Sequence, residues 1–182
     1  GFYIPERKIM LDCGNSNLSN LSPEFIFVTH CHADHISEIA KILSGKNKSI
    51  PKIYCPISIR SRIRNLSNAF YSLTKNTDSP KIHGAYSIIG VEPTMKYPFN
   101  YGNIKTHVEI IKCNHTVTSY GYGFIDLRTK LKPEFADLVQ SELDALSQTC
   151  TLTNEHEVPL FCYLGDTNES VLYTQDGKHA DI

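Results

Sequence analysis

Phe25-Ile26-Phe27-Val28-Thr29, an apolar run typical of a buried strand, leads directly into His30-Cys31-His32-Ala33-Asp34-His35. Three imidazoles and one carboxylate within six residues are too concentrated for a packed core or an ordinary polar surface. Imidazole nitrogens and carboxylate oxygens are ligands of zinc, and catalytic zinc sites combine about three protein ligands with an open position. The stretch predicts a metal site in which a turn directs two ligands to one ion and two to a neighbouring ion. A satisfied polar loop or an adventitious metal site is the alternative, and the demanding pattern disfavours it.

The segment after this turn has the period of a helix. Its apolar residues recur at helical spacing, and Ser44-Gly45 ends the helix. These residues are Ile36, Ile39, Ala40 and Leu43. The candidate ligands therefore join a strand to a helix. Cys31 is a further candidate as a soft ligand, but its side chain points away from the ion if His30 and His32 point toward it.

The composition fits one soluble globular domain. A chain of 182 residues with 41% hydrophobic residues is long enough to bury a core. No apolar run approaches the roughly 20 residues of a membrane span, and the N-terminus lacks a basic segment followed by an apolar one. We therefore expect a soluble, intracellular, cytoplasmic protein. The six cysteines form no CxxC pair, so reduced buried thiols are expected.

Charge is segregated along the chain although the net charge is only −1. Residues 41–82 hold nine Lys or Arg against one acid, a net of 9 − 1 = +8. Residues 131–182 hold two Lys against ten acids, a net of 2 − 10 = −8. Such asymmetry can attract an anion to one face of a nearly neutral protein. A merely solvated basic segment explains the first stretch equally well.

Other polar residues stand at the ends of predicted strands. Asp12 follows the run 8–11, where a carboxylate could fix the tautomer of a ligand imidazole; a turn-forming Asp before glycine is the alternative. His115 follows the run 104–112 and is the best-placed distant ligand, and Asp166 follows the run 159–164. The remaining histidines are expected to be ordinary structural residues: His83, His107, His156 and His179.

The rest of the chain alternates between strand and helix patterns. Further strands are predicted at 52–55, 86–91, 104–112, 120–127, 159–164 and 171–173. One helix is predicted at 136–148, and another opens at Pro56 with an apolar stripe of Ile59, Ile63, Leu66, Phe70 and Leu73. Arg60, Arg62 and Arg64 lie off that stripe. Guanidinium groups match phosphate well, although a solubilising face is the alternative.

The motif His30–His35 behind a strand resembles the signature of the metallo-β-lactamase superfamily. Further segments resemble its ribonuclease Z branch, endonucleases that trim the 3′ end of precursor tRNA. They are Leu11-Asp12-Cys13-Gly14, Asn114-His115-Thr116, Ser119-Tyr120-Gly121-Tyr122-Gly123, Lys130-Leu131-Lys132-Pro133-Glu134-Phe135 and Gly165-Asp166-Thr167. The resemblance implies an α/β fold, a four-layer αββα sandwich with metals at the sheet edges. It also implies a single domain over residues 1–182 that is incomplete at its C-terminus.

The resemblance further implies roles for the candidate residues. His30, His32 and His115 would hold one zinc, Asp34 and His35 would help hold a second, and Asp166 would bridge the two. Manganese and magnesium stay open as alternatives to zinc. The catalytic residues would be Asp34 and Asp166, with Asp12 supporting a ligand from behind. Substrate binding would fall to Arg60, Arg62, Arg64 and Tyr122, with Ser119–Gly123 lining the site; a β-turn is the alternative reading of that segment.

The implied reaction is removal of the 3′ trailer of precursor tRNA by metal-bound hydroxide, with RNA as the partner, no membrane, and a homodimer left open. Two other functions stay open, a thioester or lactam hydrolase of the same superfamily and a non-catalytic RNA-binding relative. The sequence shows no proton-donating His-Glu-Ala-Thr-like segment, no metal-binding His after Asp166 and no recognisable arm for gripping tRNA. Residues 1–182 alone are therefore expected to be inactive and poorly soluble.

Overall fold

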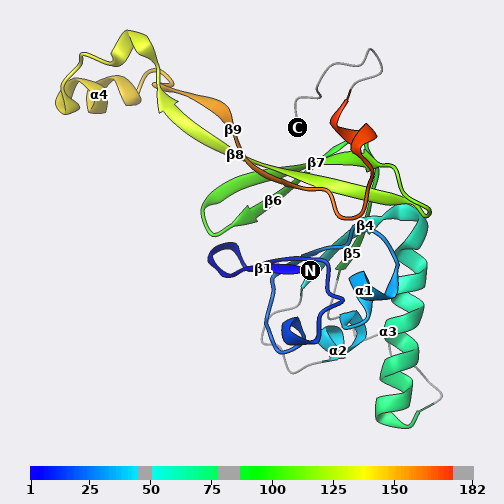
Figure 1. Ribbon diagram of the computed structural model, residues 1–182. Coiled ribbons are helices and arrows are strands. Elements are labelled where there is room, and N and C mark those ends of the chain that lie inside the picture. Colours follow the sequence, from blue (N-terminus) through cyan, green and yellow to red (C-terminus); the bar gives the residue numbers. More distant parts are fainter. Residues whose placement is uncertain (45–50, 78–86, 174–182) are drawn as a thin grey trace.

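Two β-sheets face each other in the computed structural model, which describes residues 1–44, 51–77 and 87–173 (Figure 1). The first sheet has the strand order β1-β2-β3-β4-β5, and the second has the order β6-β7-β8-β9. The first comprises β1 (Phe2–Ile4), β2 (Ile9–Leu11), β3 (Phe25–Phe27), β4 (Lys52–Pro56) and β5 (Ser87–Val91). The second comprises β6 (Lys96–Tyr101), β7 (Ile104–Cys113), β8 (Ser119–Leu131) and β9 (Thr153–Tyr163).

Helices cover the outer face of the first sheet. Strands β2 to β5 are parallel, so the chain must cross over between them, and its crossovers carry α2 (Ile39–Ser44) and α3 (Arg60–Lys75). Apolar side chains of both helices pack on the sheet, among them Ile42 and Ile63. Burial on both faces explains why β2, β3 and β4 read as continuous apolar runs rather than alternating ones.

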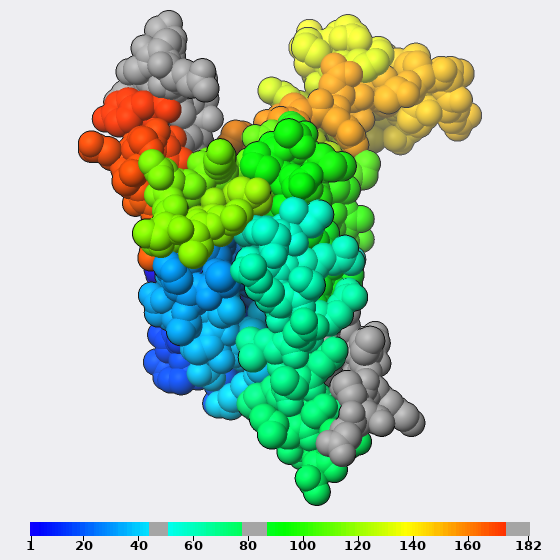
Figure 2. All heavy atoms as spheres, turned by 90° about the vertical axis from the view of Figure 1, so that its right-hand side faces the viewer, coloured from blue at the N-terminus to red at the C-terminus, as the bar shows by residue number. Residues whose placement is uncertain are grey.

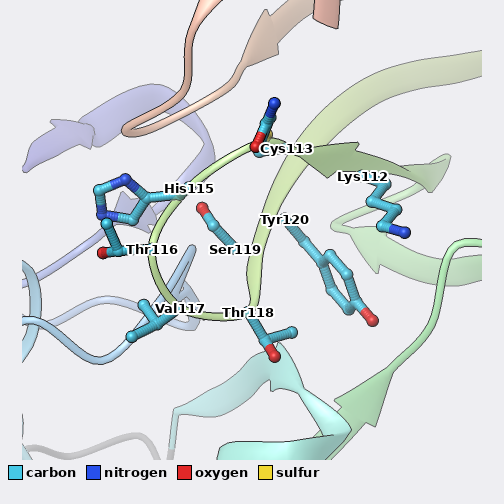
Figure 3. Close-up of a pocket in the computed structure, with 9 residues that line it drawn as sticks. Lys112, Cys113, His115, Thr116, Val117, Thr118, Ser119 and Tyr120 are labelled. Carbon is cyan, nitrogen blue, oxygen red and sulfur yellow. The ribbon is translucent and has the colours of Figure 1, made fainter.

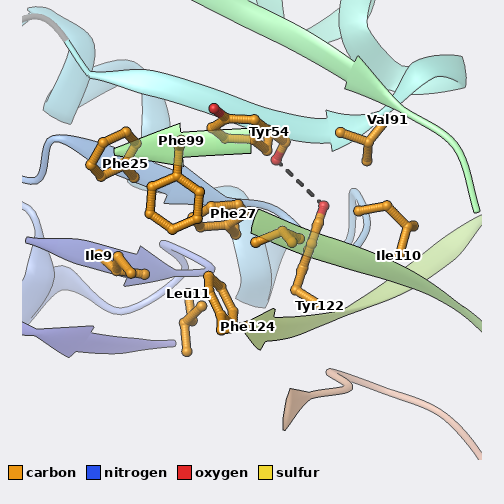
Figure 4. Packing of buried hydrophobic residues seen from close by; sticks show 11 residues of the cluster. Ile9, Leu11, Phe25, Phe27, Tyr54, Val91, Phe99, Ile110, Tyr122 and Phe124 are labelled. Carbon is orange, nitrogen blue, oxygen red and sulfur yellow. Dashed lines mark hydrogen bonds between the residues drawn. The ribbon is translucent and has the colours of Figure 1, made fainter. Parts of the chain in front are cut away.

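The main core lies between the two sheets and is rich in aromatic rings (Figure 4). Phe27 of β3 stacks on Tyr54 with ring centroids 4.7 Å apart and meets Phe124 edge-on at 4.9 Å. Phe27 has no exposed surface, so truncating it to Ala would cost about 3–5 kcal/mol of stability. This packing fixes the end of β3, from which the candidate ligands leave.

Tyr122 belongs to this core, which corrects its expected role in substrate binding. The side chain is fully buried between the sheets, and its hydroxyl donates to the backbone carbonyl of Val28 and, at 3.4 Å, to that of Tyr54. Side chains alternate along a strand, so Tyr122 points into the sandwich while its neighbours Gly121 and Gly123 lie on the other face. It therefore anchors β8 to the first sheet.

A hairpin arm projects from the second sheet (Figure 1). Strands β8 and β9 stay paired out to Leu131 and Thr153, far beyond the edge of the sandwich. The arm ends in a short 3-10 turn, η4 (Pro133–Phe135), and a helix, α4 (Gln140–Ser147). The expected helix at 136–148 therefore forms, but at the tip of an arm that the sequence did not reveal.

The expected α/β class with two facing sheets is confirmed. In the described part of the chain the sandwich has three layers, because α4 lies on the arm and does not cover the second sheet. The expected helix at 36–43 is divided into α1 (Ala33–Ile36) and α2. The prediction of a short strand at 171–173 is wrong, because Glu169–Leu172 forms a 3-10 turn, η5.

Two further features of the described residues bear on the sequence predictions. The apolar stripe of α3 is buried at Ile59 and Ile63 only, whereas Leu66, Phe70 and Leu73 are exposed by 42%, 37% and 82%. Across the described ranges, no helix has both the length and the apolar character that a bilayer crossing requires.

Candidate metal centre

The candidate ligands converge where three strands end. His30 and His32 follow β3, His115 follows β7, and Asp166 follows β9. Asp34 and His35 lie on the single turn of α1. In Figure 2 the loop that carries His115 sits directly above the segment that carries the first histidines, with the η5 segment beside it. The fold thus brings together residues from both sheets at one edge.

Three imidazoles face one point. The Nδ1 atom of His32 lies 3.1 Å from Nε2 of His30 and 3.1 Å from Nε2 of His115. Tetrahedral zinc with bonds of about 2.0–2.1 Å needs ligand atoms roughly 3.3 Å apart. The spacing of the three nitrogens therefore fits the face of a zinc coordination tetrahedron.

A second group forms beside the first, shares His30 with it and includes Asp166. Its Oδ1 atom lies 3.3 Å from Nε2 of His35, and its Oδ2 atom lies 4.0 Å from Nε2 of His115. Asp34 also approaches His35, with its Oδ2 atom 3.5 Å from Nε2. One carboxylate thus has an oxygen toward each group, which is the arrangement that two neighbouring cations need from a bridging ligand.

Asp12 lies behind the ligands and is completely buried. Its Oδ2 atom accepts a hydrogen bond from Nδ1 of His35 at 2.8 Å, and its Oδ1 atom accepts one from the backbone N–H of Thr29 at 2.8 Å. A proton on Nδ1 of His35 leaves the Nε2 lone pair free to face Asp166 and Asp34. Asp12 does not itself reach the cluster of ligand atoms.

Two residues that the sequence reading missed complete this network. The Thr29 hydroxyl donates to Asp12 at 2.8 Å and lies 2.9 Å from Nδ1 of His30, so it fixes the orientation of a second imidazole. The Tyr163 hydroxyl donates to Oδ2 of Asp12 at 2.9 Å. Thr29 directly precedes the ligand motif, so its position in the sequence could have suggested a role. Tyr163 lies 151 residues from Asp12, and only the fold brings the two together.

Glycines allow the backbones around the ligands to approach closely. A Cβ at Gly14 would lie 1.7 Å from the carbonyl oxygen of Asp34, so only glycine fits against the α1 turn. Gly165 has φ +65°, and a Cβ there would lie 2.8 Å from the side chain of Thr29. Gly14 and Gly165 thus allow the segments that carry the candidate ligands to pack closely against each other.

The loop between β7 and β8 borders an open pocket of about 700 Å³ (Figure 3). Figure 3 shows His115 and Thr116 on one side of the loop and Lys112 and Tyr120 on the other. Tyr120, and not Tyr122, is therefore the tyrosine of the Ser119–Gly123 segment that reaches the pocket. A hydrogen bond of 3.0 Å from the Asn114 backbone N–H to Thr167 ties this loop to the segment of Asp166.

The three arginines are exposed on the first turns of α3. Figures 1 and 2 both have this end of α3 next to the β7–β8 loop. Of the two residues between these arginines, Ile63 is buried and Ser61 is exposed. The end of α3 that carries these arginines therefore lies near the β7–β8 loop, and the arginines are not part of the ligand cluster.

The surroundings of His30 and His35, the two buried histidines of the candidate metal centre, shift their pKa values in opposite directions. Burial lowers the pKa of His30 below its ordinary value, and the nearby imidazole of His35 lowers it further. The hydrogen bond to Asp12 raises the pKa of His35, with the carboxylates of Asp166 and Asp34 contributing. His30 is thus held in the neutral form that ligates metal, while the carboxylates around His35 favour a positive charge at that position.

The donor set fits divalent cations. Three ligand atoms from His30, His32 and His115 form one group within 4.8 Å of one another, and atoms from His30, His35 and Asp166 form another. Cys31 packs against the outer apolar cluster under the helices instead of facing the ligands. Nitrogen and oxygen donors in this number suit zinc, and the metal-dependent character implied by the motifs therefore has a structural basis.

Comparison with known proteins gives relatives of one kind. No family model matches the chain. The chloroplastic tRNase Z TRZ2 of Arabidopsis thaliana is 24% identical over 182 residues, covering 98% of this chain and 48% of the relative. A ribonuclease Z of Borrelia duttonii is 28% identical over 152 residues, covering 75% of this chain and 44% of the relative. A nuclear ribonuclease Z of Triticum aestivum is 22% identical and covers 79% of this chain.

Among solved structures, the metallo-β-lactamase fold protein YhfI of Bacillus subtilis aligns over 64% of this chain and 45% of its own, with 21% identity and a TM-score of 0.43. The fold assignment rests on the sheet order and the facing sheets rather than on that alignment. The chain spans about half the length of the curated relatives it matches first. The expected resemblance to ribonucleases Z is confirmed.

Proposed function

We propose, from this resemblance, that the chain is the metal-binding part of an endoribonuclease that removes the 3′ trailer of precursor tRNA. The observation that carries the proposal is the presence of two adjoining ligand groups that share His30, in a chain similar to ribonucleases Z over almost all of its length. The enzyme would act inside the cell, in the compartment that holds its precursor tRNA, which we take to be the cytoplasm.

In this proposal each candidate residue has one task. His30, His32 and His115 hold the first ion, and His35 with Asp34 holds the second. Asp166 joins the two groups through its two oxygens, in keeping with its approaches of 3.3 Å and 4.0 Å to the neighbouring histidines. Thr29 and Asp12 keep the imidazoles oriented. We propose zinc for both ions because of the nitrogen-rich donor set.

A bound pair of divalent ions lowers the pKa of a water molecule and stabilises negative charge on a phosphodiester. The chain's own residues then determine how the phosphodiester is presented. Asp166 and Asp34 are the carboxylates nearest the two groups, with side chains exposed by 48% and 78%, so they can accept a proton or contact substrate. The pocket beside Tyr120 and His115 offers room for nucleotides next to the scissile bond.

RNA would lie across the edge that carries the arginines. Arg60, Arg62 and Arg64 are exposed cations at the end of α3 that lies near the β7–β8 loop, where the backbone phosphates of a substrate in the pocket would pass. The projecting β8–β9 arm is the candidate for a second contact with tRNA, although its residues 128–157 hold three Lys or Arg against six acids. A homodimer also stays a prediction, supported by the exposed apolar residues Leu66, Phe70 and Leu73 of α3.

The test is cleavage of a precursor tRNA with a 3′ trailer by the polypeptide that carries residues 1–182. Product ending at the mature 3′-hydroxyl, lost in His32→Ala and retained in the matched exposed-histidine control His156→Gln, supports the proposal. Turnover of a thioester or lactam without RNA cleavage would assign the site to another hydrolase of the superfamily. RNA binding without any turnover would indicate a non-catalytic relative.

A further inference from the structure

A second cluster of potential ligands lies on the outer face of the second sheet, away from the candidate metal centre. Val108 and Ile110 of β7 point into the core, so the alternation of side chains places His107 and Glu109 on the opposite face. Glu157 of β9 joins them there, and the ligand atoms of all three lie within 4.8 Å of one another. These residues come from strands that are separated by β8.

His107 is the unusual member of this cluster. It is only 5% exposed, and its Nε2 atom has no hydrogen-bond partner, the sole such buried side-chain nitrogen or oxygen among the described residues. A buried imidazole nitrogen without a partner is unfavourable, because it has lost water and gained nothing in exchange. This atom is directed at the carboxylates, with Oε1 of Glu157 at 3.6 Å and Oε1 of Glu109 at 4.0 Å.

These separations exceed a hydrogen bond but suit a shared ion. Ligand atoms around tetrahedral zinc stand about 3.3 Å apart, so an ion between these three needs only small side-chain movements. One imidazole and two carboxylates supply three donors of types that zinc binds, which would leave one position for water. The sequence reading treated His107 as an ordinary structural residue, since a lone histidine within a strand carries no such pattern.

Lys96 pairs with both carboxylates of the cluster in the structure. Its Nζ atom lies 2.9 Å from Oε1 of Glu109 and 2.8 Å from Oε1 of Glu157. This contact lowers the pKa of Glu157, which keeps the carboxylate ionised. The Lys96 side chain is 51% exposed, so it can leave the cluster for solvent. The ammonium satisfies the two carboxylates but leaves the imidazole nitrogen unpaired.

We propose that His107, Glu109 and Glu157 form a second, independent site for a divalent ion of the zinc class, for which Lys96 competes as an internal cation. Binding would pair the buried nitrogen and link β7 to β9 where the arm leaves the sandwich. The site does not share a residue with the candidate metal centre and does not depend on the proposed function. It adds a stabilising ion to the sheet that supports the arm.

Zinc titration by calorimetry tests this site in a background in which both ligand groups of the first centre are disabled by His32→Ala, His35→Ala and His115→Ala. The background should bind about one zinc per chain. His107→Gln and Glu157→Gln should each weaken that binding at least about tenfold, as expected for loss of a ligand. Lys96→Gln should tighten it by about tenfold or more, because it removes the competing cation. The gain in zinc affinity distinguishes a metal site from a plain ion-pair network, because loss of Lys96 would only weaken such a network.

Two matched controls lie on the same sheet. His156→Gln removes an exposed histidine next to Glu157, and Lys105→Gln removes a lysine that pairs with Glu155 at 2.8 Å, so neither should alter zinc binding. If the background does not fold, the same substitutions are made in the unaltered chain and the number of bound zinc ions is compared. No zinc bound beyond the first centre, or an unchanged affinity in His107→Gln, would overturn the proposal.

Discussion

The Oδ2 atom of Asp12 lies 2.8 Å from Nδ1 of His35, although 23 residues separate them in the chain. The same carboxylate also accepts hydrogen bonds from Thr29 and Tyr163, so it connects β2, β3 and β9 behind the ligands. Asp12 has φ +54°, a left-handed conformation that Asp tolerates better than most residues. Its position therefore depends on this network rather than on local backbone preference.

Replacing Asp12 by Asn should reduce metal affinity by about 10- to 100-fold, because mutation of residues that hydrogen-bond to metal-ligating imidazoles has effects of this size. The amide of Asn has one acceptor oxygen, whereas the carboxylate of Asp12 accepts from several donors. The hydrogen bond that fixes the tautomer of His35 is therefore lost. Zinc competition against a chromogenic chelator measures the change. Asp137→Asn, an exposed Asp on the arm, is the control. Equal affinities in Asp12→Asn and the control would contradict the role given to this residue.

Gly14→Ala should displace the α1 turn and weaken metal binding although Gly14 carries no ligand. The new Cβ would meet the Asp34 carbonyl at 1.7 Å, and backbone on both sides prevents an easy adjustment. Gly123→Ala is the matched control, since its nearest contacts would be ordinary ones at 3.8 Å and beyond. We expect Gly14→Ala to lower the melting temperature and the metal content together. Normal metal content in that variant would argue against the close packing of Gly14 on α1.

Metal content itself gives a direct prediction. Protein purified without chelator should hold close to two divalent ions in the candidate metal centre, and His32→Ala should lose most of them, because His32 contacts both neighbouring imidazoles. Removing the ions with EDTA should lower stability, by about 2.7 kcal/mol if the free metal had stood at 100 times its dissociation constant. Elemental analysis and thermal melting measure both effects. Absence of bound metal in active protein would contradict the prediction.

The sequence singled out the residues that converge at the candidate metal centre, but it said less about the framework around them. The candidate ligands His30, His32 and His35 share one turn, so their type and spacing are visible locally, and Asp12, His115 and Asp166 each follow an apolar run. The substrate-binding role of Tyr122 was inferred from the family resemblance, whereas the burial of its side chain depends on the facing sheet. The arm was missed because nothing local distinguishes a strand that leaves the sandwich from one that stays.

An ion pair between the sheets makes stability depend on pH. Arg7, in the 3-10 turn η1 (Pro5–Arg7), donates to both carboxylate oxygens of Asp126 at 2.8 and 2.7 Å. Thr106 donates a further hydrogen bond of 2.9 Å to this carboxylate, whose side chain is 1% exposed. The hydrogen bonds from Arg7 lower the pKa of Asp126 below its ordinary value. Removing the guanidinium by Arg7→Met would leave a buried, poorly paired carboxylate and should cost about 3 kcal/mol.

Because the folded-state pKa of Asp126 is lowered, the contribution of its charge is fully present above the unfolded pKa of about 3.9. It is lost as the pH falls below that value and through the folded pKa. The stability difference between the natural chain and Asp126→Asn should therefore be constant from neutral pH to about pH 5 and shrink below about pH 4. Urea unfolding at a series of pH values measures it. A difference that grew on acidification would have the wrong sign for this pair.

The arginines of α3 allow a test of the RNA-binding edge. If Arg60, Arg62 and Arg64 contact phosphates, changing all three to Gln should weaken RNA binding and flatten its salt dependence. Each lost contact should remove a slope of about 0.7 to 0.9 in log K against log salt. Lys75→Gln provides the control, since Lys75 ends the same helix and lies about 16 Å or more along its axis from Arg64. Binding is measured by fluorescence anisotropy at several salt concentrations. A triple variant with the slope of the natural chain would reduce these arginines to a solubilising face of the helix.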